Sequence, residues 1–409
     1  LLVLIVSSTT NKLLPFLPLP LVQILLGIVI GLFLPNTDFH LNTELFLALV
    51  IGPLLFRESE EADITAILKH WRIIVYLIFP VIFISTLSLG GLAHLLWLSL
   101  PLAACLAVGA ALGPTDLVAF ASLSERFSFP KRVSNILKGE GLLNDASGLV
   151  AFQVALAAWT TGAFSLGQAG SSLIFSILGG FLIGFLTAMT NRFLHTFLLS
   201  VRATDIASEL LLELSLPLVT FFLAEEVHVS GIIAVVVAGI LKASRFKKIT
   251  LLEAQVDTVT ETVWHTVTFM LNGSVFVILG IELETIAEPI LTNPIYNPLL
   301  LLVSLVALTF VLFAIRFVMI YGYYAYRTRR LKKKLNKYMK DMLLLTFSGV
   351  KGTVSIATIL LIPSDLEQEY PILLFLVAGV TLVSFLTGLL VLPHLSDEQE
   401  ESKDYLMHI

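Results

Sequence analysis

GEGLLNDASG, at residues 139–148, follows GPTD, at residues 113–116, by about one membrane span within an otherwise apolar sequence. The two stretches carry three carboxylates, those of Asp116, Glu140 and Asp145. An ionised carboxylate at the centre of a bilayer costs about 3 kcal/mol even on a lenient insertion scale, so such residues usually mark an ion or proton path. The two stretches therefore indicate both the class of fold and the kind of function.

The composition identifies an integral membrane protein. The 409 residues are 57% hydrophobic and 13% charged, with a mean hydropathy of +0.93, whereas soluble domains carry about 25% charged residues. Apolar runs recur from end to end and leave no room for a soluble domain. We therefore expect an all-α polytopic membrane protein in which residues 1–409 form a single membrane transport domain, with a short cytoplasmic tail at 394–409.

Apolar runs punctuated by Pro, Gly and charge predict about thirteen transmembrane helices. The predicted spans are 1–12, 15–34, 43–57, 72–90, 99–123, 133–158, 171–190, 205–225, 229–242, 264–283, 297–325, 342–363 and 371–393. Alternate loops hold 21 of the 25 Lys and Arg residues, and the positive-inside rule places those loops in the cytoplasm. We expect a multi-pass protein of a bacterial plasma membrane, with its N-terminus outside and its C-terminus cytoplasmic.

Two of the predicted spans contain helix-breaking residues. Gly113 and Pro114 interrupt 99–123, since proline lacks an amide hydrogen and clashes with the preceding turn, and Gly349 and Gly352 flank the centre of 342–363. The two spans are seven positions apart in the order, which is an odd number, so the two broken helices would cross the membrane in opposite directions, as an inverted repeat requires. The alternative for Gly-Pro is a simple kink packed against neighbouring helices.

The charged residues of these segments are predicted to have different roles. Glu140 and Asn144 share a helix face, whereas Asp145 is turned by about 100°. We expect Glu140 to pair with Arg316, a charge that would otherwise be alone in a span. Burial raises the pKa of an unpaired carboxyl toward neutrality, so a proton and a monovalent cation can compete for it. Asp145 is the candidate for that carboxylate, and a structural, hydrogen-bonded acid is the alternative.

Lys351 is predicted to lie at the second break. There its ammonium would offset the negative C-terminal end of a half-helix, as Asp116 would offset a positive N-terminal end in the other broken helix. The alternative is a lysine that snorkels to the interface.

Other polar residues give weaker signals. Glu213 is predicted to face a cavity, and Glu209 to be solvated near a span end. The acids of residues 58–63 indicate a solvated helix end, with a cation-attracting funnel as the alternative. The four Trp residues, which include Trp264, fall at predicted span ends, where headgroups favour them. No nucleotide-binding motif is present, so we expect a secondary transporter rather than an enzyme, driven by ion gradients, with no cofactor and no nucleic-acid partner.

Four stretches resemble the bacterial monovalent cation/proton antiporters of the sodium/hydrogen exchanger type. They are GPTD at 113–116, GEGLLND at 139–145, LAEEVHVSG at 223–231 and FSGVKG at 347–352. The resemblance implies an inverted-repeat fold with two crossed discontinuous helices, elevator-like alternating access and a homodimer. It also implies scaffold and dimerisation helices at 1–70 and about 165–290, and core transport helices at about 71–160 and 297–393.

The resemblance also implies roles for individual residues. Asp145 matches the exchanging carboxylate, with Asp116 and Thr115 as ion-site residues of the broken helix. The supporting residues are Asn144, Glu140, Arg316 and Lys351. Asn144 before the aspartate is similar to the electroneutral branch. Four positions depart from the usual family pattern, namely Arg57, Leu117, Gly141 and Lys351, and they leave the cation preference open.

The function implied is exchange of Na+ for H+, with Li+ or K+ as further substrates, in sodium transport and pH homeostasis. A K+/H+ antiporter of the same fold is one alternative. A cation channel-like protein is another, although the sequence shows no pore loop or filter. The third is an organic-solute symporter, which also uses broken helices.

Overall fold

The computed structural model forms two compact helical units. It describes residues 1–13, 17, 19–33, 43–116, 119–120, 123, 127–161, 166–201, 205–243, 251–292, 297–330, 335–359, 361–362, 370–395 and 397–398. Unit 1 comprises Leu1–Leu17, Leu21–Thr65 and Ala157–Thr285, and unit 2 comprises Pro18–Pro20, Ala66–Leu156 and Ile286–Ile409. Each unit is therefore assembled from segments that are far apart in the sequence.

Unit 1 is built around α4, α11, α12 and α13, which pack against one another. Its helices are α1 (Leu2–Leu13), α2 (Leu19–Phe33), α3 (Thr43–Phe46), the π-helical turn η1 (Leu47–Ile51), α4 (Gly52–Glu61), α11 (Leu166–Ser200), α12 (Ile206–Glu226), α13 (Gly231–Ala243) and most of α14 (Leu251–Thr292). Asp205 begins α12 with a reciprocal capping box, because its carboxylate accepts from the Ser208 amide and its amide donates to the Ser208 hydroxyl.

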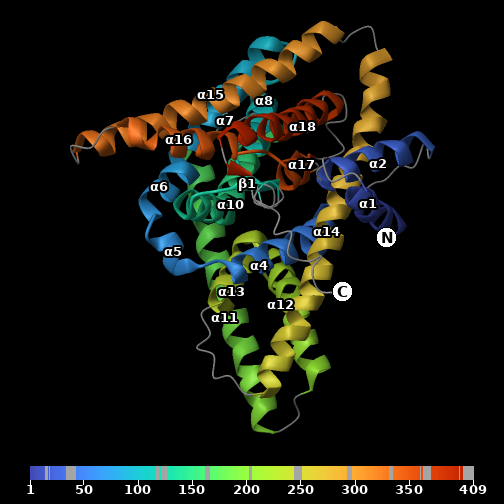
Figure 1. Ribbon diagram of the computed structural model, residues 1–409, viewed down its shortest axis with the longest axis vertical. Coiled ribbons are helices and arrows are strands. Elements are labelled where there is room, and N and C mark those ends of the chain that lie inside the picture. The colour runs from blue at the N-terminus through green and yellow to red at the C-terminus, as the bar shows by residue number, and fades with distance from the viewer. Residues whose placement is uncertain are drawn as a thin grey trace. The chain divides into compact units, whose positions relative to one another are not determined.

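Unit 2 contains the predicted broken helices. Its elements are α6 (Trp71–Tyr76), the π-helical turn η2 (Leu77–Val81), α7 (Ile82–Leu96), α8 (Leu102–Ala111), β1 (Phe127–Ser128), most of α10 (Lys131–Thr161), α15 (Pro298–Arg330), the 3-10 turn η3 (Leu335–Tyr338), α16 (Met339–Phe347), α17 (Thr353–Ile359), α18 (Tyr370–Leu395) and β2 (Asp397–Glu398). The short helix α5 (Ile64–Leu68) spans the boundary at Thr65. In Figure 1, α15 (orange) lies beside α16, with which it packs.

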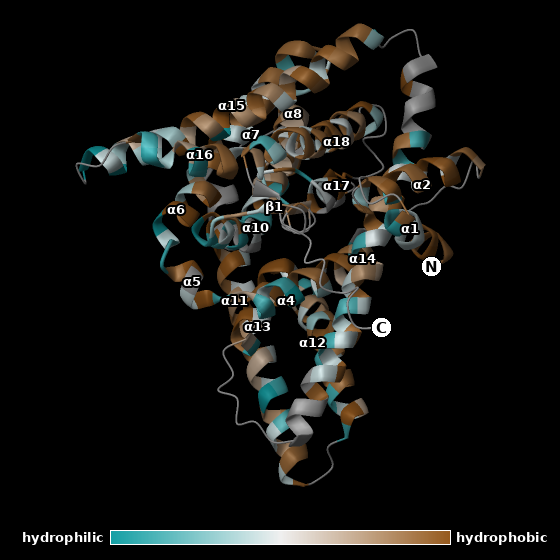
Figure 2. Cartoon of the chain, in the orientation of Figure 1, coloured by the Kyte–Doolittle hydropathy of each residue, from teal (hydrophilic) through white to brown (hydrophobic). Residues whose placement is uncertain are grey.

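The fold is a helical membrane protein, as predicted. Within the described part of the chain, six helices are long and apolar enough to cross a membrane: Trp71–Leu96, Ile174–Ser200, Ile206–Glu226, Thr258–Glu284, Pro298–Arg330 and Tyr370–Leu395. Figure 2 shows α15 and α18 as predominantly hydrophobic, and the C-terminal end of α15 as hydrophilic. Shorter apolar helices occupy several of the other predicted spans, so the number thirteen stays a prediction.

The helix ends differ from the prediction mainly where helices continue into polar sequence. α11 extends to Ser200 and α15 to Arg330, and α14 begins at Leu251, whereas the prediction ended or began these helices at 190, 325 and 264. Charged side chains stop a membrane span but do not stop a helix, because Glu, Lys and Arg are good helix formers. The predicted tail is also partly ordered, since α18 continues to Leu395 and β2 pairs antiparallel with β1. Residue 396 and residues 399–409 lie outside the described residues.

Candidate functional site

The two predicted breaks meet in unit 2. α8 ends at Ala111 and α16 at Phe347, and both chains continue without helical structure, to residue 116 in one and residue 352 in the other. The Asp116 amide donates to the Val350 carbonyl at 3.0 Å, so the two interruptions are hydrogen-bonded to each other. A Cβ at Gly352 would overlap the Asp116 side chain. Glycine at 352 is therefore what lets the two segments come this close.

Lys351 occupies the crossing of the breaks. Its side chain is buried, with a residue exposure of 1%, and Nζ donates to the carbonyls of Gly113 (2.8 Å) and Pro114 (2.6 Å). These carbonyls lie just past the end of α8, where the helix dipole is negative. The Lys351 amide also donates to Ser384 Oγ of α18 at 3.1 Å. The ammonium is thus held inside the unit, and the snorkelling alternative is wrong.

Asp116 is the last described residue of the non-helical segment that follows α8. Its carboxylate Oδ1 accepts from the Ala119 amide at 2.7 Å, and the residue is 5% exposed. This is the geometry of an N-cap, in which a carboxylate satisfies a free amide and offsets the positive end of a helix. One oxygen of Asp116 is therefore committed to the backbone.

Glu140 and Arg316 form a two-pronged ion pair between α10 and α15. The guanidinium donates through its two terminal nitrogens to Oε1 (2.6 Å) and Oε2 (2.7 Å), and Nε donates to the Leu345 carbonyl of α16 at 3.0 Å. Glu140 is 1% exposed and Arg316 is 3% exposed. The planar fork of arginine matches a carboxylate in this arrangement. The pairing expected from the sequence is present, and it fastens α10, α15 and α16 together.

Thr115 and Asn144 connect this ion pair to the broken helix. Asn144 Nδ2 donates to the Thr115 carbonyl (3.0 Å) and to its Oγ1 (2.7 Å), and the Thr115 hydroxyl donates to Glu140 Oε1 at 3.3 Å. Because two acceptors face Nδ2, the amide orientation is determined by its partners. Asn144 Oδ1 is consequently turned away from Thr115.

The side chains of Asn144 and Asp145 on α10 each keep one buried oxygen that the described hydrogen bonds do not use. Asn144 is 0% exposed and Asp145 is 3% exposed, and within the described part of the chain Oδ1 of each residue has no hydrogen-bond partner. No ion pair within the described ranges reaches Asp145, which interacts electrostatically with Asp116 and Lys351. A buried acceptor without a partner costs free energy. Such a pair of oxygens is suited to a proton or to a hard monovalent cation, which prefers oxygen ligands.

We define the core cluster as the five charged side chains around these breaks: Asp116, Glu140, Asp145, Arg316 and Lys351. Every predicted site residue lies in or beside it, because Thr115 and Asn144 bridge its members. Among the described residues, no group of three or more His, Cys, Asp and Glu side chains is arranged to hold a metal ion.

Sequence reasoning missed several residues that shape the core cluster. A Cβ at Gly148 would overlap the Pro114 ring, so this glycine allows α10 to pack against the first break. Ser147 donates to the Asn144 carbonyl at 2.7 Å and to the Ile78 carbonyl of η2 at 3.3 Å. Both residues belong to the quoted stretch 139–148. A small residue at helical spacing from the acids was the signal that could have found them.

A second buried charged cluster lies in unit 1, and the sequence did not predict it. We define the Lys242 cluster as Arg57, Glu60, Glu61, Glu213 and Lys242. Lys242 Nζ lies 2.5 Å from Glu213 Oε2 and 3.7 Å from Glu60 Oε1. Arg57 contacts Glu60 Oε2 at 2.9 Å and Glu61 Oε1 at 2.7 Å. Within this cluster every oxygen of Glu60 has a cationic neighbour.

The structure shows Glu213 paired and corrects the predictions for Trp264, for residues 58–63 and for Glu209. Glu213 is paired on both oxygens, since Lys242 holds one and Trp264 Nε1 donates to the other at 3.0 Å. Trp264 is 1% exposed and packs against Phe56, so it is not a headgroup anchor. Glu60 is largely buried, so residues 58–63 are not simply a solvated end. Glu209, predicted to be solvated, contacts His195 at 2.6 Å.

Comparison with known proteins agrees with this geometry. Residues 1–396 match the family described as sodium/hydrogen exchanger, transmembrane. The chain belongs to this exchanger family. The resemblance read from the four motifs is thereby confirmed, and the chain is a multi-pass membrane protein of a transporter family.

Relatives of this exchanger chain include two named sodium, potassium, lithium and rubidium/H+ antiporters. One, from Bacillus subtilis, is 36% identical over 96% of this chain, and the other, from Bacillus pumilus, is 35% identical over 97%. The chain spans 60% of the length of each. An uncharacterized Na+/H+ exchanger of Escherichia coli is 31% identical, over 96% of this chain and 74% of its own length.

A solved structure supports the fold of the exchanger. The sodium proton antiporter of Methanocaldococcus jannaschii, solved at pH 8, superposes with a TM-score of 0.69 over 96% of each chain. The two sequences are 18% identical. The likeness therefore concerns the fold.

Proposed function

We propose that this chain is the membrane part of a secondary antiporter that exchanges Na+ for H+ by alternating access, with the two ions competing for Asp145. The observation that carries the proposal is the buried Oδ1 of Asp145, which has no hydrogen-bond partner among the described residues, as is also true of Oδ1 of Asn144, the preceding residue. The Bacillus relatives are named for exchange of monovalent cations for protons. The names of these relatives support cation/proton exchange, and the Oδ1 atoms of Asp145 and Asn144 suggest where the ion binds.

The core cluster suggests how exchange remains coupled. Glu140 is occupied by Arg316, Lys351 by two carbonyls and Asp116 by the Ala119 amide. Asp145 is then the group left to accept a positive ion. A bare carboxylate is costly to carry across a low-dielectric barrier, and either H+ or a monovalent cation removes that cost. The unoccupied form therefore crosses slowly, which suppresses uncoupled leak.

The proposal also assigns roles to the two units. Unit 2, which holds both breaks, would be the moving core, and unit 1 would be the scaffold through which a homodimer forms. The proposed moving core comprises about 71–160 and 297–393, and the proposed scaffold comprises 1–70 and about 165–290. The basic loops would face the cytoplasm of a bacterial cell, which places the N-terminus outside.

The cation range is proposed to extend beyond Na+. The Bacillus relatives carry potassium, lithium and rubidium in their names along with sodium. Two oxygens on adjacent residues of a helix form an open ligand set, which discriminates poorly between monovalent cations of different size. K+/H+ exchange by the same site is therefore the second candidate function.

The test uses the full chain reconstituted in proteoliposomes with an acidic lumen and an internal pH dye. Adding Na+, Li+, K+ or Rb+ outside should dissipate the pH gradient, and the apparent KM for Na+ should rise as the external pH falls, because protons compete for the same carboxylate. Asp145→Asn should abolish the response. Glu61→Gln, the same change at a side chain that is 61% exposed, should leave it unchanged.

Two outcomes would contradict the proposal. No response to any of the four cations between about pH 6 and 9 would remove antiport as the function. Exchange by Asp145→Asn with an unaltered KM would leave antiport standing but move the site elsewhere.

A further inference from the structure

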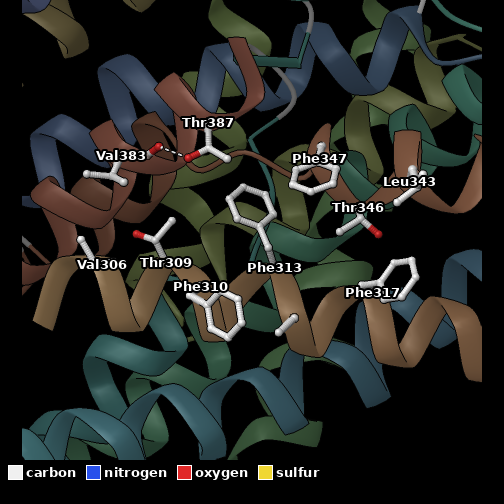
Figure 3. Close-up of a pocket in the computed structure, with 11 residues that line it drawn as sticks. Val306, Thr309, Phe310, Phe313, Phe317, Leu343, Thr346, Phe347, Val383 and Thr387 are labelled. Carbon is white, nitrogen blue, oxygen red and sulfur yellow. Dashed lines mark hydrogen bonds between the residues drawn. The ribbon is translucent and has the colours of Figure 1, made fainter. Parts of the chain in front are cut away.

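An apolar groove lies on unit 2 between α15, α16 and α18, away from the polar side chains of the core cluster. Figure 3 shows Val306, Thr309, Phe310, Phe313 and Phe317 along one wall, Leu343, Thr346 and Phe347 on α16, and Val383 and Thr387 on α18. Ala314 completes the lining, and the cavity volume is about 500 Å³. The groove is therefore large enough to hold a substantial apolar ligand.

The groove offers no polar group to a ligand. Its three threonine hydroxyls each donate to the carbonyl four residues earlier in their own helix, at 2.7–2.8 Å: Thr309 to Leu305, Thr346 to Met342 and Thr387 to Val383. Their hydrogen-bonding capacity is thus largely used within the helices. A sugar, peptide or ion would lose its water there and gain no partner. The chemistry of the lining favours a hydrocarbon chain.

The groove opens to the surface of the unit at its rim. Phe310 is 72% exposed and Val306 is 57% exposed, whereas Phe313 is buried against Phe347, with ring centroids 5.3 Å apart. From Val306 to Phe317 the wall follows twelve residues of α15, whose eleven steps of 1.5 Å make about 16 Å. One leaflet of a bilayer has a hydrocarbon thickness of about 15 Å. The groove therefore has the length of one leaflet.

One end of the groove leads to a strong concentration of positive charge. Residues 327–341 contain eight Lys and Arg residues and a single acid, Asp341, which contacts Arg132 at 3.7 Å. The described cations of this basic segment are exposed: Arg327, Arg329, Arg330, Lys337 and Lys340. Lys340 lies one helical turn from Leu343 at the end of the groove. Clustered cations beside a membrane helix attract anionic lipid headgroups by about 1 kcal/mol for each Lys or Arg.

We infer that the groove binds one acyl chain of an anionic phospholipid whose phosphate lies at the described, exposed cations of the basic segment, which are Arg327, Arg329, Arg330, Lys337 and Lys340. The apolar lining matches the tail, the length matches one leaflet, and the cations match the headgroup. The inner wall of this site is α16, whose Leu345 carbonyl accepts from Arg316. The bound lipid therefore packs against the helix that holds the second break. The inference concerns lipid binding and does not depend on which ion is exchanged.

The experiment places a fluorescent reporter at the rim. The full chain carrying Phe310→Trp is reconstituted in phosphatidylcholine vesicles that contain either dibrominated phosphatidylglycerol or dibrominated phosphatidylcholine at the same mole fraction. Quenching of the added tryptophan is obtained by subtracting the wild-type signal. We expect several-fold stronger relative binding of the brominated anionic lipid, and a decline of that preference with added salt.

Two sets of variants in the reporter background test the site itself. Ala314→Phe fills the groove and should remove the preference, whereas Val318→Phe, on the same helix at a position that is 63% exposed and does not line the groove, should retain it. Replacing Arg327, Arg329 and Arg330 by Gln should equalise the two lipids without abolishing quenching. Equal quenching by both lipids in the parent reporter, or a preference that survives Ala314→Phe, would overturn the inference. Absence of quenching by either lipid would show that protein covers the groove and would also overturn it.

Discussion

The Lys242 cluster and the core cluster both gather charged side chains inside helical units, yet they differ in how their buried carboxylates are paired. In the Lys242 cluster each carboxylate of Glu60 and Glu213 is held on both oxygens. In the core cluster Glu140 is held in the same way, but Asp145 keeps a buried oxygen without a partner. Fully paired charge orders a structure, and an unsatisfied carboxylate is free to take a mobile ion. Among the described residues, the comparison separates acids that are paired on both oxygens from one that keeps an oxygen for a ligand.

The largest expected effect is that replacing Asp145 abolishes exchange without lowering the stability of the protein. Asp145→Asn removes an unpartnered buried carboxylate, so the temperature of unfolding in detergent should stay the same or rise. Exchange in proteoliposomes should vanish. A marked loss of stability would indicate that Asp145 is paired like Glu213, and the contrast between the clusters would be lost.

Breaking the ion pair of the core cluster should have the next largest effect. Arg316→Met leaves the Glu140 carboxylate buried without its partner, and we expect a loss of about 3–5 kcal/mol in stability. Size-exclusion chromatography after heating would measure it. The double variant Glu140→Leu/Arg316→Met should recover much of the loss, because no uncompensated charge remains. A single variant as stable as the wild type would contradict the assigned pairing.

A corresponding change in the Lys242 cluster should be milder and should spare the exchange reaction. Lys242→Met leaves Glu213 and Glu60 without their shared cation, but their side chains are 13% and 16% exposed, so the expected loss is about 2–4 kcal/mol. The apparent KM for Na+ of the folded protein should be unchanged. A shifted KM would show that unit 1 takes part in ion binding.

The smallest effect is predicted for packing at the first break. Gly148→Ala places a methyl group against the Pro114 ring, and we expect a loss of about 1–3 kcal/mol together with weaker cation binding. The matched control is Gly322→Ala on α15, where a Cβ meets nothing within 4 Å. That control should gain about 0.5–1 kcal/mol, because glycine is a poor helix former. Equal effects at both positions would argue against a tight approach at Gly148.

The sequence predicted the breaks and the pairing of Glu140 with Arg316 because charges and helix breakers within apolar runs demand an explanation. It did not predict the Lys242 cluster, since a lysine at a span end is indistinguishable from an interfacial one. Trp264 was misplaced for a related reason, because α14 begins at Leu251 and carries the tryptophan into the unit. Contacts between segments far apart in the chain, such as that of Ser384 with Lys351, have no local signature. The inverted relation of the two broken helices stays a prediction.

The net charge of the core cluster decides how strongly the membrane potential acts on it. Three carboxylates and two cationic side chains leave one formal negative charge. A single bound proton or alkali ion makes the sum zero, whereas Mg2+ or Ca2+ would leave it positive. Moving one uncompensated elementary charge across a membrane potential of 100 mV changes its free energy by about 2.3 kcal/mol. On the proposed mechanism, a cluster loaded with one monovalent ion would carry no net formal charge and would couple weakly to the membrane potential, whereas a divalent ion would leave it positive.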